Sequence, residues 1–352
     1  MQLPVKAIKA QAVPAIVKLS AALSAVVGTA IAAGLMIYVG IGDIAAAIAG
    51  AGWGVLAVIA FHFAQMAFSA SAWRTVLPTT PVPGLVRFIG LRWIREAVNA
   101  LLPVAQIGGE FVGARLLAFR QVRADAAGAC VTVDLTLEMI SQIIFTLFGI
   151  GLLVIRPHDA KIVQYITGIT ATAIAVVIAF VLTQRFGFFR LIERGLVRLA
   201  AKMGWAGLSE VSGLHEAIVG LYQQPRRLAL ACLYHFVSWL LGGLEVMLAL
   251  YAVGVEIDLR EGLIIESLGQ ALRAVGFAVP GSLGVQEGGY VLVCGLLGVG
   301  PQAAIELSLI KRIREIALGV PGLIAWQIIE GKRLAWRLGG GGSGPAALRP
   351  GP

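Results

Sequence analysis

The stretch Pro280-Gly-Ser-Leu-Gly-Val-Gln-Glu-Gly-Gly289 separates two apolar runs, residues 263–279 and 290–299. Proline and clustered glycine break a helix, and broken backbone at membrane depth is tolerated only where protein or a water-filled cavity covers it. The carboxylate of Glu287 lies within the break, and an ionisable group inside an apolar segment indicates a functional site. The alternative is a short extramembrane turn between two ordinary spans. A second copy of the pattern elsewhere in the chain favours the first interpretation.

The composition is that of a polytopic helical membrane protein. Of the 352 residues, 58% are hydrophobic and 13% are charged, whereas about 25% are charged in soluble domains. The mean hydropathy is +0.87. Runs such as 19–39 and 162–183 are long enough to cross a hydrocarbon core of ~30 Å, which takes about 20 helical residues.

The membrane domain is predicted to occupy residues 19–338 as a single unit. Full spans are expected at about 19–39, 53–77, 126–155, 162–183, 228–253 and 303–329. The basic residues collect in loops beside these spans, so the net charge of +9 reflects the positive-inside rule rather than nucleic-acid binding. Both termini are therefore expected on the cytoplasmic side of a bacterial inner membrane.

Three flanking segments complete this organisation. Residues 1–18 are expected to be cytoplasmic, and the glycine-rich residues 339–352 form a flexible tail with no assigned function. In the loop 185–227, Arg190, Arg194 and Arg198 share one helix face. That spacing fits an amphipathic helix on the anionic inner leaflet, and a solvated cytoplasmic helix fits it nearly as well.

Two ranges, 85–120 and 263–299, are predicted to be re-entrant hairpins of broken helices. Neither half of the first range is long and apolar enough for a comfortable span, although two short full spans are the alternative. The residues expected to break the helices are Pro103, Gly108, Gly109, Pro280, Gly281 and Gly284.

The two hairpins match at a constant offset of 177 residues. Pro103 corresponds to Pro280, and Glu110 corresponds to Glu287. The same offset pairs Glu138 with Glu315 in the following spans. Three predicted spans separate the hairpins, so the second enters from the opposite side of the membrane. This is the inverted-repeat plan of secondary transporters, whose broken helices meet near the midplane.

The sixth predicted span carries Lys311, Arg312, Arg314 and Glu315. An arginine at the bilayer centre costs about 2.5–3.5 kcal/mol on insertion scales, so these cations need partners or water. Lys311 can share one helix face with Arg314 and Glu315 while Arg312 points elsewhere. The candidate partners are Glu110, Asp134, Glu138, Glu245, Glu287 and Glu315. The result is either a buried ion network that fixes helix packing or a polar pocket for a lipid head group.

The remaining polar residues give no enzyme signature. His62 and His235 are expected to make helix-to-helix hydrogen bonds, and Glu245 is either a proton carrier or a core partner. The four histidines lack metal-ligand spacing, and neither a P-loop nor a nucleophile elbow is present. We therefore expect no catalytic residues, no metal and no cofactor.

Three stretches resemble one family: Asn99-Ala-Leu-Leu-Pro-Val-Ala-Gln-Ile-Gly-Gly-Glu-Phe-Val-Gly-Ala-Arg115, the opening stretch, and Leu309-Ile-Lys-Arg-Ile-Arg-Glu315. They resemble the flippase-like family, the membrane region of lysylphosphatidylglycerol synthases that also occurs as stand-alone proteins. The sequences of these three motifs are most similar to those of the hopanoid-biosynthesis-associated branch of the stand-alone members. By this resemblance the family's pocket falls on Gln106, Glu110, Arg115, Gln286, Glu287, Arg312 and Glu315.

The resemblance implies translocation of a membrane lipid, a hopanoid or a hopanoid-conjugated lipid. Arg312 and Arg314 are expected to hold the head group, while Glu110 and Glu287 exchange protons. The alternatives are a membrane subunit of an aminoacyl-lipid or glycosyl-lipid enzyme complex and a non-transporting scaffold for hopanoid synthesis, each with enzyme partners. The expected site comprises Gln106, Glu110, Arg115, Asp134, Glu138, Gln286, Glu287, Lys311, Arg312, Arg314 and Glu315.

Overall fold

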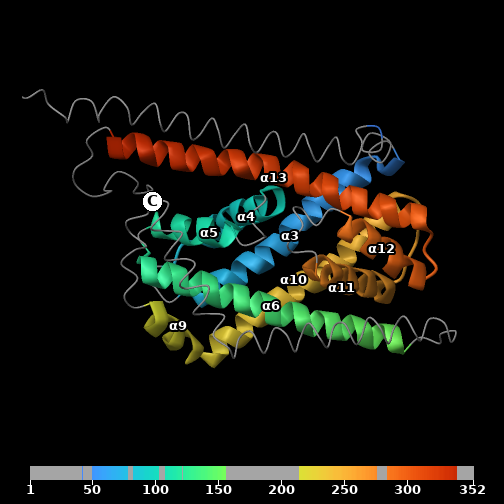
Figure 1. The fold of residues 1–352 in the computed structure, drawn as a ribbon, viewed down its shortest axis with the longest axis horizontal. Helices are drawn as coiled ribbons and strands as arrows, with labels where there is room; N and C mark the ends of the chain where they lie inside the picture. The colour runs from blue at the N-terminus through green and yellow to red at the C-terminus, as the bar shows by residue number, and fades with distance from the viewer. Residues whose placement is uncertain are drawn as a thin grey trace, which may run out of the picture.

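The computed structural model describes residues 51–77, 82–102, 108–120, 122–155, 214–275 and 284–338, together with Gly42 and Gly50. Every regular element in these ranges is an α-helix (Figure 1). The predicted spans at 19–39 and 162–183 lie outside the described residues, as does most of the basic loop. So do the predicted site residue and helix breakers Gln106, Pro103, Pro280 and Gly281.

Nine helices make up the described part of the chain. Their bounds are α3 Trp53–Val76, α4 Leu85–Leu101, α5 Gly108–Ala118, α6 Ala124–Val154, α9 Leu214–Tyr222, α10 Pro225–Ala252, α11 Leu259–Val275, α12 Val285–Leu296 and α13 Pro301–Leu338. In the predicted hairpin ranges the structure has α4 with α5 and α11 with α12. Their re-entrant course stays a prediction.

Three of these helices, α3, α6 and α10, are long and apolar enough to cross a membrane. They correspond to the spans predicted at 53–77, 126–155 and 228–253. Helix α13 covers the span predicted at 303–329 but is longer, with 38 residues, because it continues through Pro321 and into the basic residues beyond. Because of the charged residues near its middle, α13 is not among the helices apolar enough to cross a membrane by composition.

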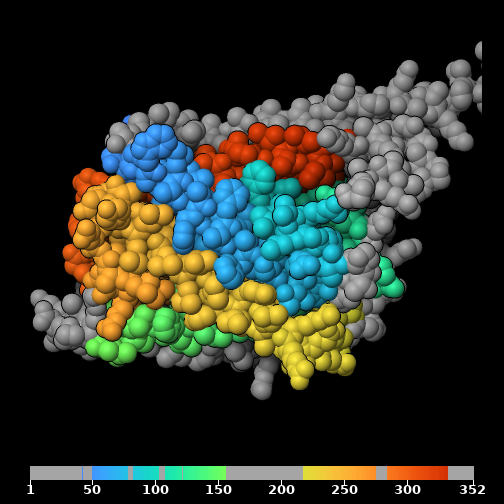
Figure 2. Space-filling view, turned by 180° about the vertical axis from the view of Figure 1, so that it is seen from behind, coloured from blue at the N-terminus to red at the C-terminus, as the bar shows by residue number. Residues whose placement is uncertain are grey.

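Helices α3 and α10 form the centre of the molecule and run side by side (Figures 1 and 2). Helices α6 and α13 lie along opposite edges, with α4–α5 near one end and α11–α12 near the other (Figure 1). We call α3–α6 the first unit and α10–α13 the second unit. In chain order their helices have 24, 17, 11 and 31 residues against 28, 17, 12 and 38.

Each unit packs its second helix against the last helix of the other unit. Helix α4 contacts α13, where the Trp93 Nε1–H donates to the Leu318 carbonyl oxygen at 2.7 Å. Helix α11 contacts α6, where the Gln142 Nε2–H donates to the Gln270 carbonyl oxygen at 3.2 Å. A Cβ on Gly322 of α13 would lie 2.6 Å from Cβ of Ala97, so glycine is needed for this close approach. The two units are therefore interlocked.

Glycines define the ends of two helices of the second unit. Gly254 follows α10 with φ 82°, and Gly298 follows α12 with φ 79°. After α10, the Val255 N–H donates to the Leu250 carbonyl oxygen at 2.9 Å, which satisfies a terminal carbonyl as in a Schellman motif. Glycine adopts this left-handed backbone without steric cost.

The predicted helix breakers that the structure describes differ in where they lie relative to the helices. Gly284 has φ 77° and directly precedes α12. Gly108 and Gly109 instead are the first two residues of α5. A Cβ on Gly109 would lie 2.2 Å from the Arg95 carbonyl oxygen, so this glycine permits α5 to approach α4 closely.

Buried apolar side chains form two separate cores. The first gathers around Trp73 and Phe88 from the C-terminal half of α3, with α4, α5 and the start of α6. The second gathers around Ile264 and Tyr290 from α11 and α12, with the start of α3 and the ends of α6 and α10. The region between the two cores holds the buried charged residues.

Apolar side chains also cover parts of the outer surface. On α6, Ile144, Leu147 and Phe148 are exposed at spacings that place them on one helix face. Leu230 and Leu233 are exposed one helical turn apart on α10. An outward apolar face on a helix long enough to span a bilayer is what contact with lipid tails requires.

Candidate functional site

A layer of polar side chains crosses the middle of the three apolar helices. His62 and Gln65 are the tenth and thirteenth of the 24 residues of α3. Glu138 is the fifteenth of 31 residues in α6, and Ser238 is the fourteenth of 28 in α10. At a rise of about 1.5 Å per residue these positions are well inside a hydrocarbon core. Ionisable groups at such depth need partners.

Two arginines on α4 are the centre of the first-unit ion network. Arg95 is 1% exposed and contacts Glu110 at 2.5 Å, Asp134 at 2.5 Å and Glu138 at 3.3 Å. Its guanidinium carbon also lies 5.2 Å from the Trp73 ring centroid. Three carboxylates on α5 and α6 thus converge on one guanidinium.

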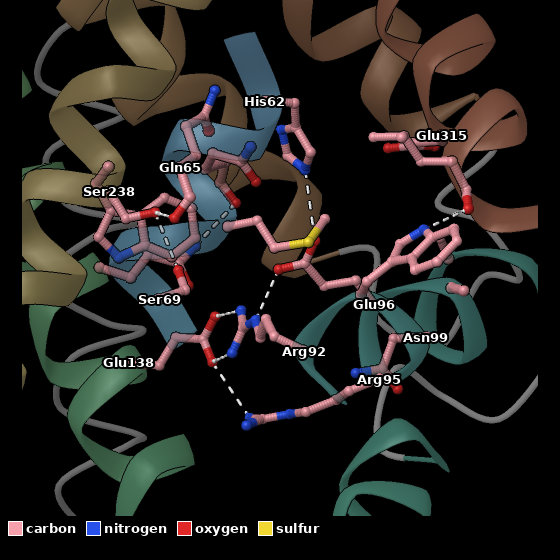
Figure 3. A pocket seen from close by; sticks show the side chains of 18 of the residues that line it. His62, Gln65, Ser69, Arg92, Arg95, Glu96, Asn99, Glu138, Ser238 and Glu315 are labelled. Atoms are coloured by element: carbon pink, nitrogen blue, oxygen red, sulfur yellow. Dashed lines mark hydrogen bonds and ion pairs between the residues drawn. The ribbon is translucent and has the colours of Figure 1, made fainter. Parts of the chain in front are cut away.

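Arg92 lies one helical turn before Arg95 and shares Asp134 and Glu138 with it. It makes a bidentate ion pair with Glu138, one arm of which measures 3.0 Å, and contacts Glu96 at 2.6 Å (Figure 3). Asp134 also accepts a contact from the His235 Nε2 atom at 2.9 Å. The two α4 arginines therefore tie α4 to α6, and Asp134 continues the network to α10.

The second-unit network is centred on Glu245 of α10, which is fully buried. Arg314 and Gln65 both donate to this carboxylate, and Lys311 lies 3.9 Å from it. Lys311 also pairs with Glu266 on α11 and lies 5.5 Å from the Tyr290 ring centroid. Helices α3, α10, α11 and α13 meet through these contacts.

A further branch runs from α13 to the start of α12. Arg312 contacts Glu287 at 3.1 Å and Glu315 at 3.0 Å, and Arg273 contacts Glu315 at 2.6 Å. The Glu287 carboxylate also accepts the Gly284 N–H at 2.7 Å, which caps the N-terminus of α12. Lys311 and Arg314 of α13 both approach Glu245 of α10. Glu315, which was predicted to share their face, instead pairs with Arg312.

His62 of α3 connects the two networks. Its Nε2 atom lies 3.4 Å from Glu96 of α4, and its Nδ1 atom lies 3.1 Å from Glu245 of α10. The prediction that His62 and His235 make helix-to-helix hydrogen bonds is confirmed by these contacts and by the His235–Asp134 contact.

A cavity of about 310 Å³ lies between the two units and is bordered by these networks (Figure 3). This volume is at the lower end of the range for small-ligand pockets, about 300–1,000 Å³. Helices α3, α4, α5, α6, α10, α11 and α13 all contribute to its lining. The charged and histidine side chains of the lining are His62, Arg92, Arg95, Glu96, Glu110, Glu138, Glu266, Arg273, Arg314 and Glu315.

The lining combines compensated charge with neutral hydrogen-bonding groups and two indoles. Gln65, Ser69 and Ser238 lie along one wall (Figure 3). The indole N–H groups of Trp93 and Trp239 already donate to Leu318 and Ser141, respectively. Such a cavity can bind a polar head group by hydrogen bonds to ion-paired carboxylates and guanidiniums.

The structure divides the predicted site residues into three groups. Glu110, Glu138, Arg314 and Glu315 line the cavity. Asp134, Lys311 and Arg312 are buried outside this lining, and Glu287 is partly exposed at the start of α12; each is in an ion pair with residues named above. Away from it lie Arg115, which pairs with Glu330 at 2.6 Å, and Gln286, whose buried amide has no hydrogen-bond partner among the described residues.

Only some of the predicted partners of the α13 cations pair with them in the structure. Glu245, Glu287 and Glu315 do pair with them, but Glu110, Asp134 and Glu138 instead pair with the arginines of α4. Glu266, which was not predicted, pairs with Lys311. Residues missing from the predicted site are Arg92, Arg95, Glu96, Glu266, Arg273 and His62. The available signal was the recurrence of Arg92, Arg95 and Glu96 at helical spacing inside an otherwise apolar segment.

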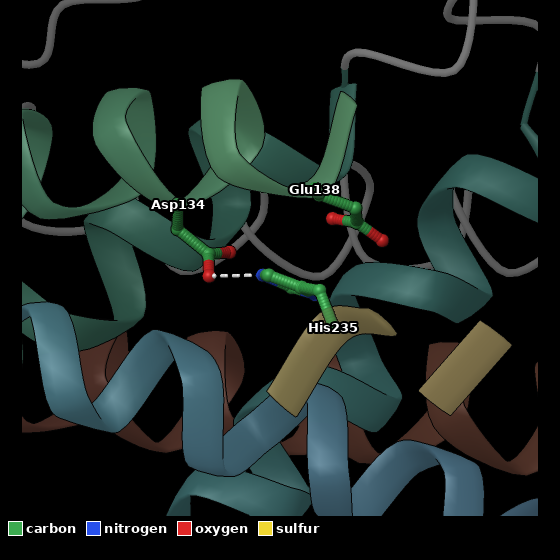
Figure 4. A group of neighbouring side chains, drawn as sticks. All are labelled: Asp134, Glu138 and His235. Atoms are coloured by element: carbon green, nitrogen blue, oxygen red, sulfur yellow. Dashed lines mark hydrogen bonds and ion pairs between the residues drawn. The ribbon is translucent and has the colours of Figure 1, made fainter. Parts of the chain in front are cut away.

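Asp134, Glu138 and His235 approach one another closely enough to raise the question of a metal (Figure 4). One ligand atom from each lies within 4.8 Å of the others. However, both carboxylates already contact Arg95, and Glu138 is held by Arg92 as well. Two guanidiniums beside the group would repel a divalent cation, so the donor set fits an ion-paired network better than a metal centre.

Comparisons with known proteins assign the chain to a family. The family described as the lysylphosphatidylglycerol synthase TM region matches residues 25–322. The chain belongs to this family. A curated relative, the UPF0104 membrane protein PH1989 of Pyrococcus horikoshii, is 22% identical over 291 residues, covering 77% of this chain and 84% of the relative. No solved structure matches the chain. This is a membrane protein of the lysylphosphatidylglycerol synthase TM-region family.

Proposed function

We propose that this protein translocates an amphiphilic lipid between the leaflets of the bacterial inner membrane. The proposed substrate is a hopanoid or a hopanoid-conjugated lipid, as the resemblance to the hopanoid-associated branch implies. The observation that carries the proposal is the cavity between the two units, because it combines a polar, ion-paired lining with a position midway along apolar helices.

The proposed topology is an inverted repeat, with both termini cytoplasmic. The matched helix lengths of the two units support it, as does their reciprocal packing of α4 on α13 and α11 on α6. Exchanging the two units maps this set of contacts onto itself, as a pseudo-two-fold axis requires. In transporters built this way the substrate site lies at the interface of the repeats, and one unit moves against the other around it.

In the proposed mechanism the lipid head group enters the cavity while the tail stays in the bilayer. Arg92, Arg95, Arg273 and Arg314 all line the cavity, and each is paired with a carboxylate. A head group therefore binds by exchanging part of these hydrogen bonds, at little cost in buried charge. Arg312 supports this set from behind through Glu315.

We propose a transporter rather than an enzyme because the acids and bases of the cavity are engaged in ion pairs across helices. None of the described residues forms a nucleophile with an adjacent free base. The ion network instead joins elements of both units. Its contacts must be exchanged when the units move, which suits a conformational cycle.

The test is lipid movement in liposomes containing purified protein. Two probes with the same fluorophore, one on a hopanoid and one on a phosphatidylcholine, report transfer between leaflets by quenching from outside. Wild type should accelerate transfer of the hopanoid probe. Ala100→Trp, which fills the cavity that Ala100 lines, should abolish it. The matched control Ala60→Trp adds the same indole to an exposed position on α3 and should leave transfer unchanged.

The family name gives a reason to retain a second candidate function. A synthase TM region is consistent with a membrane subunit that presents lipid to an aminoacyl-transferring or glycosyl-transferring enzyme, or with a scaffold for hopanoid synthesis. Affinity purification from native membranes would recover a soluble transferase at stoichiometric amounts in that case. Transfer by the purified chain alone would favour the transporter.

A further inference from the structure

The ion network in the described part of the chain carries an excess of negative charge. Its cations are Arg92, Arg95, Arg273, Lys311, Arg312 and Arg314, and its carboxylates are Glu96, Glu110, Asp134, Glu138, Glu245, Glu266, Glu287 and Glu315. Six cations face eight carboxylates, so two negative charges lack a fixed counter-ion. Two histidines, His62 and His235, lie in the same network. An uncompensated charge is expensive in a low-dielectric interior, so the network gains stability by binding protons.

Histidine is the side chain that exchanges a proton most readily near neutral pH. His235 contacts one carboxylate, that of Asp134, through Nε2 at 2.9 Å. His62 differs because each of its two ring nitrogens faces a carboxylate. Nδ1 lies 3.1 Å from Glu245, and Nε2 lies 3.4 Å from Glu96. Only the imidazolium form donates from both nitrogens, so this arrangement fits protonated His62.

A third neighbour of His62 lies where it fits the neutral imidazole equally well. Nη1 of Arg314 lies 3.1 Å from Nδ1 of His62. Since a guanidinium can only donate, this contact requires Nδ1 to be an acceptor, as in neutral imidazole. Arg314 also donates to Glu245. The three groups therefore have two consistent arrangements, one with the proton on Nδ1 pointing to Glu245 and one with Arg314 donating to Nδ1.

The elements around His62 belong to both units. Helix α3 carries His62 and Gln65, and α4 contributes Glu96 with its partner Arg92. Helix α10 contributes Glu245, and α13 contributes Arg314 with Lys311 nearby on Glu245. The α6 carboxylates contact the arginines of α4 instead of the imidazole. Proton binding at Nδ1 of this ring therefore changes contacts between the two units, because Glu245 and Arg314 both belong to the second unit.

We propose that His62 is the proton-binding site that couples lipid translocation to a transmembrane proton gradient. The inference rests on the proposed function and names its energy source. A proton from water on one side binds Nδ1, strengthens the contact of α3 with Glu245 of α10, and displaces Arg314 from the imidazole. Loss of the proton to the other side restores the Arg314 contact and leaves Glu245 without a histidine donor, while Nε2–H still faces Glu96.

Proton binding is tested first without any lipid movement. Protein labelled with ¹⁵N-histidine in lipid nanodiscs contains four histidines, and His62→Gln identifies the resonances of His62 in magnetic resonance spectra. Between pH 5 and 9, His62 should convert from imidazolium to a neutral ring with Nδ1 unprotonated. Glu245→Gln should lower its proton affinity about tenfold, because a facing charge is removed. Glu256→Gln, at an exposed position, is the matched control and should leave the titration unchanged.

A single protonation state of His62 across that range overturns the site, and so does a titration insensitive to Glu245→Gln. Glu245→Gln retains the imidazole, so the site is still tested if His62→Gln does not fold.

Coupling is tested next in phosphatidylcholine liposomes containing the fluorescent hopanoid probe, with an imposed pH gradient. Wild type should accumulate the probe in one leaflet, and reversing the gradient should reverse the accumulation. His62→Gln should equalise the probe between leaflets with no accumulation. Accumulation by wild type that ignores the gradient overturns the coupling. If wild type moves no lipid at all, the proposed function fails together with the coupling, whereas proton binding in the nanodisc experiment stands as a separate result.

Discussion

Replacement of Arg95 has the best-defined expected effect on the free energy of unfolding. Its side chain is buried among Glu110, Asp134 and Glu138 and beneath the Trp73 ring. After Arg95→Gln, Glu138 keeps Arg92 as its partner and Asp134 keeps the contact with His235. Among the described residues, Glu110 then has no ion-pair partner.

The expected loss of stability follows from the partners that remain after the substitution. Removing one partner of a buried ion pair costs about 3–5 kcal/mol, because the other charge stays buried and uncompensated. Glu110→Gln alone should cost about 1–3 kcal/mol, since it removes a charge-assisted hydrogen bond and leaves Arg95 with two carboxylates. In the double variant no lone carboxylate remains at this position. The stability loss of the double variant should therefore be smaller than the sum of the two single losses by at least about 2 kcal/mol.

The assay is the free energy of unfolding by sodium dodecyl sulfate titration, followed by tryptophan fluorescence, for wild type, both single variants and the double variant. Arg115→Gln is the control, because Arg115 and Glu330 are each 23% exposed and such a pair contributes about 0–1 kcal/mol. Additivity of the two substitutions within about 0.5 kcal/mol, or an Arg95→Gln loss no larger than that of Arg115→Gln, would refute the reasoning.

Three further predictions concern packing, ions and the cavity. Gly109→Ala should destabilise the protein by about 1–3 kcal/mol, because its Cβ would meet the Arg95 carbonyl oxygen at 2.2 Å. Gly288→Ala should be tolerated, since no atom lies within 4 Å of the added Cβ. Chelation of divalent cations should leave the melting temperature unchanged, because arginines neutralise the Asp–Glu–His group of Figure 4. Glu138→Gln should lower lipid transfer at least tenfold, measured with the leaflet-quenching assay, because Arg92 and Arg95 share this carboxylate; transfer within twofold of wild type would contradict its role.

Much of the helical architecture could be predicted from composition and apolar runs. The spans expected at 53–77, 126–155 and 228–253 correspond to α3, α6 and α10, because length and hydropathy alone define such helices. Helix α13 was harder to delimit. Its charged centre and Pro321 interrupt the hydropathy signal, although the helix continues to Leu338.

The predicted site residues coincide only in part with the lining of the cavity. The carboxylates Glu110, Glu138 and Glu315 were found because they recur at one offset, and all three line the cavity. Arg92 and Arg95 recur at helical spacing in the sequence, but they were not predicted as site residues. Periodicity identifies the face of a helix but not the helix that packs against it. The reciprocal packing of α4 on α13 and α11 on α6 brings residues far apart in sequence to one cavity, and no local pattern encodes that pairing.

The central claim is that the head group of the lipid occupies the cavity between the two units. It is tested most directly by photocrosslinking with a hopanoid probe that carries a diazirine on its head group, followed by mass spectrometry of the labelled peptides. The account predicts labelling of cavity-lining segments of α3, α4, α11 and α13, and its loss in Ala100→Trp. Labelling confined to outward apolar positions such as Leu230 and Leu233 of α10, and unaffected by that substitution, would contradict it.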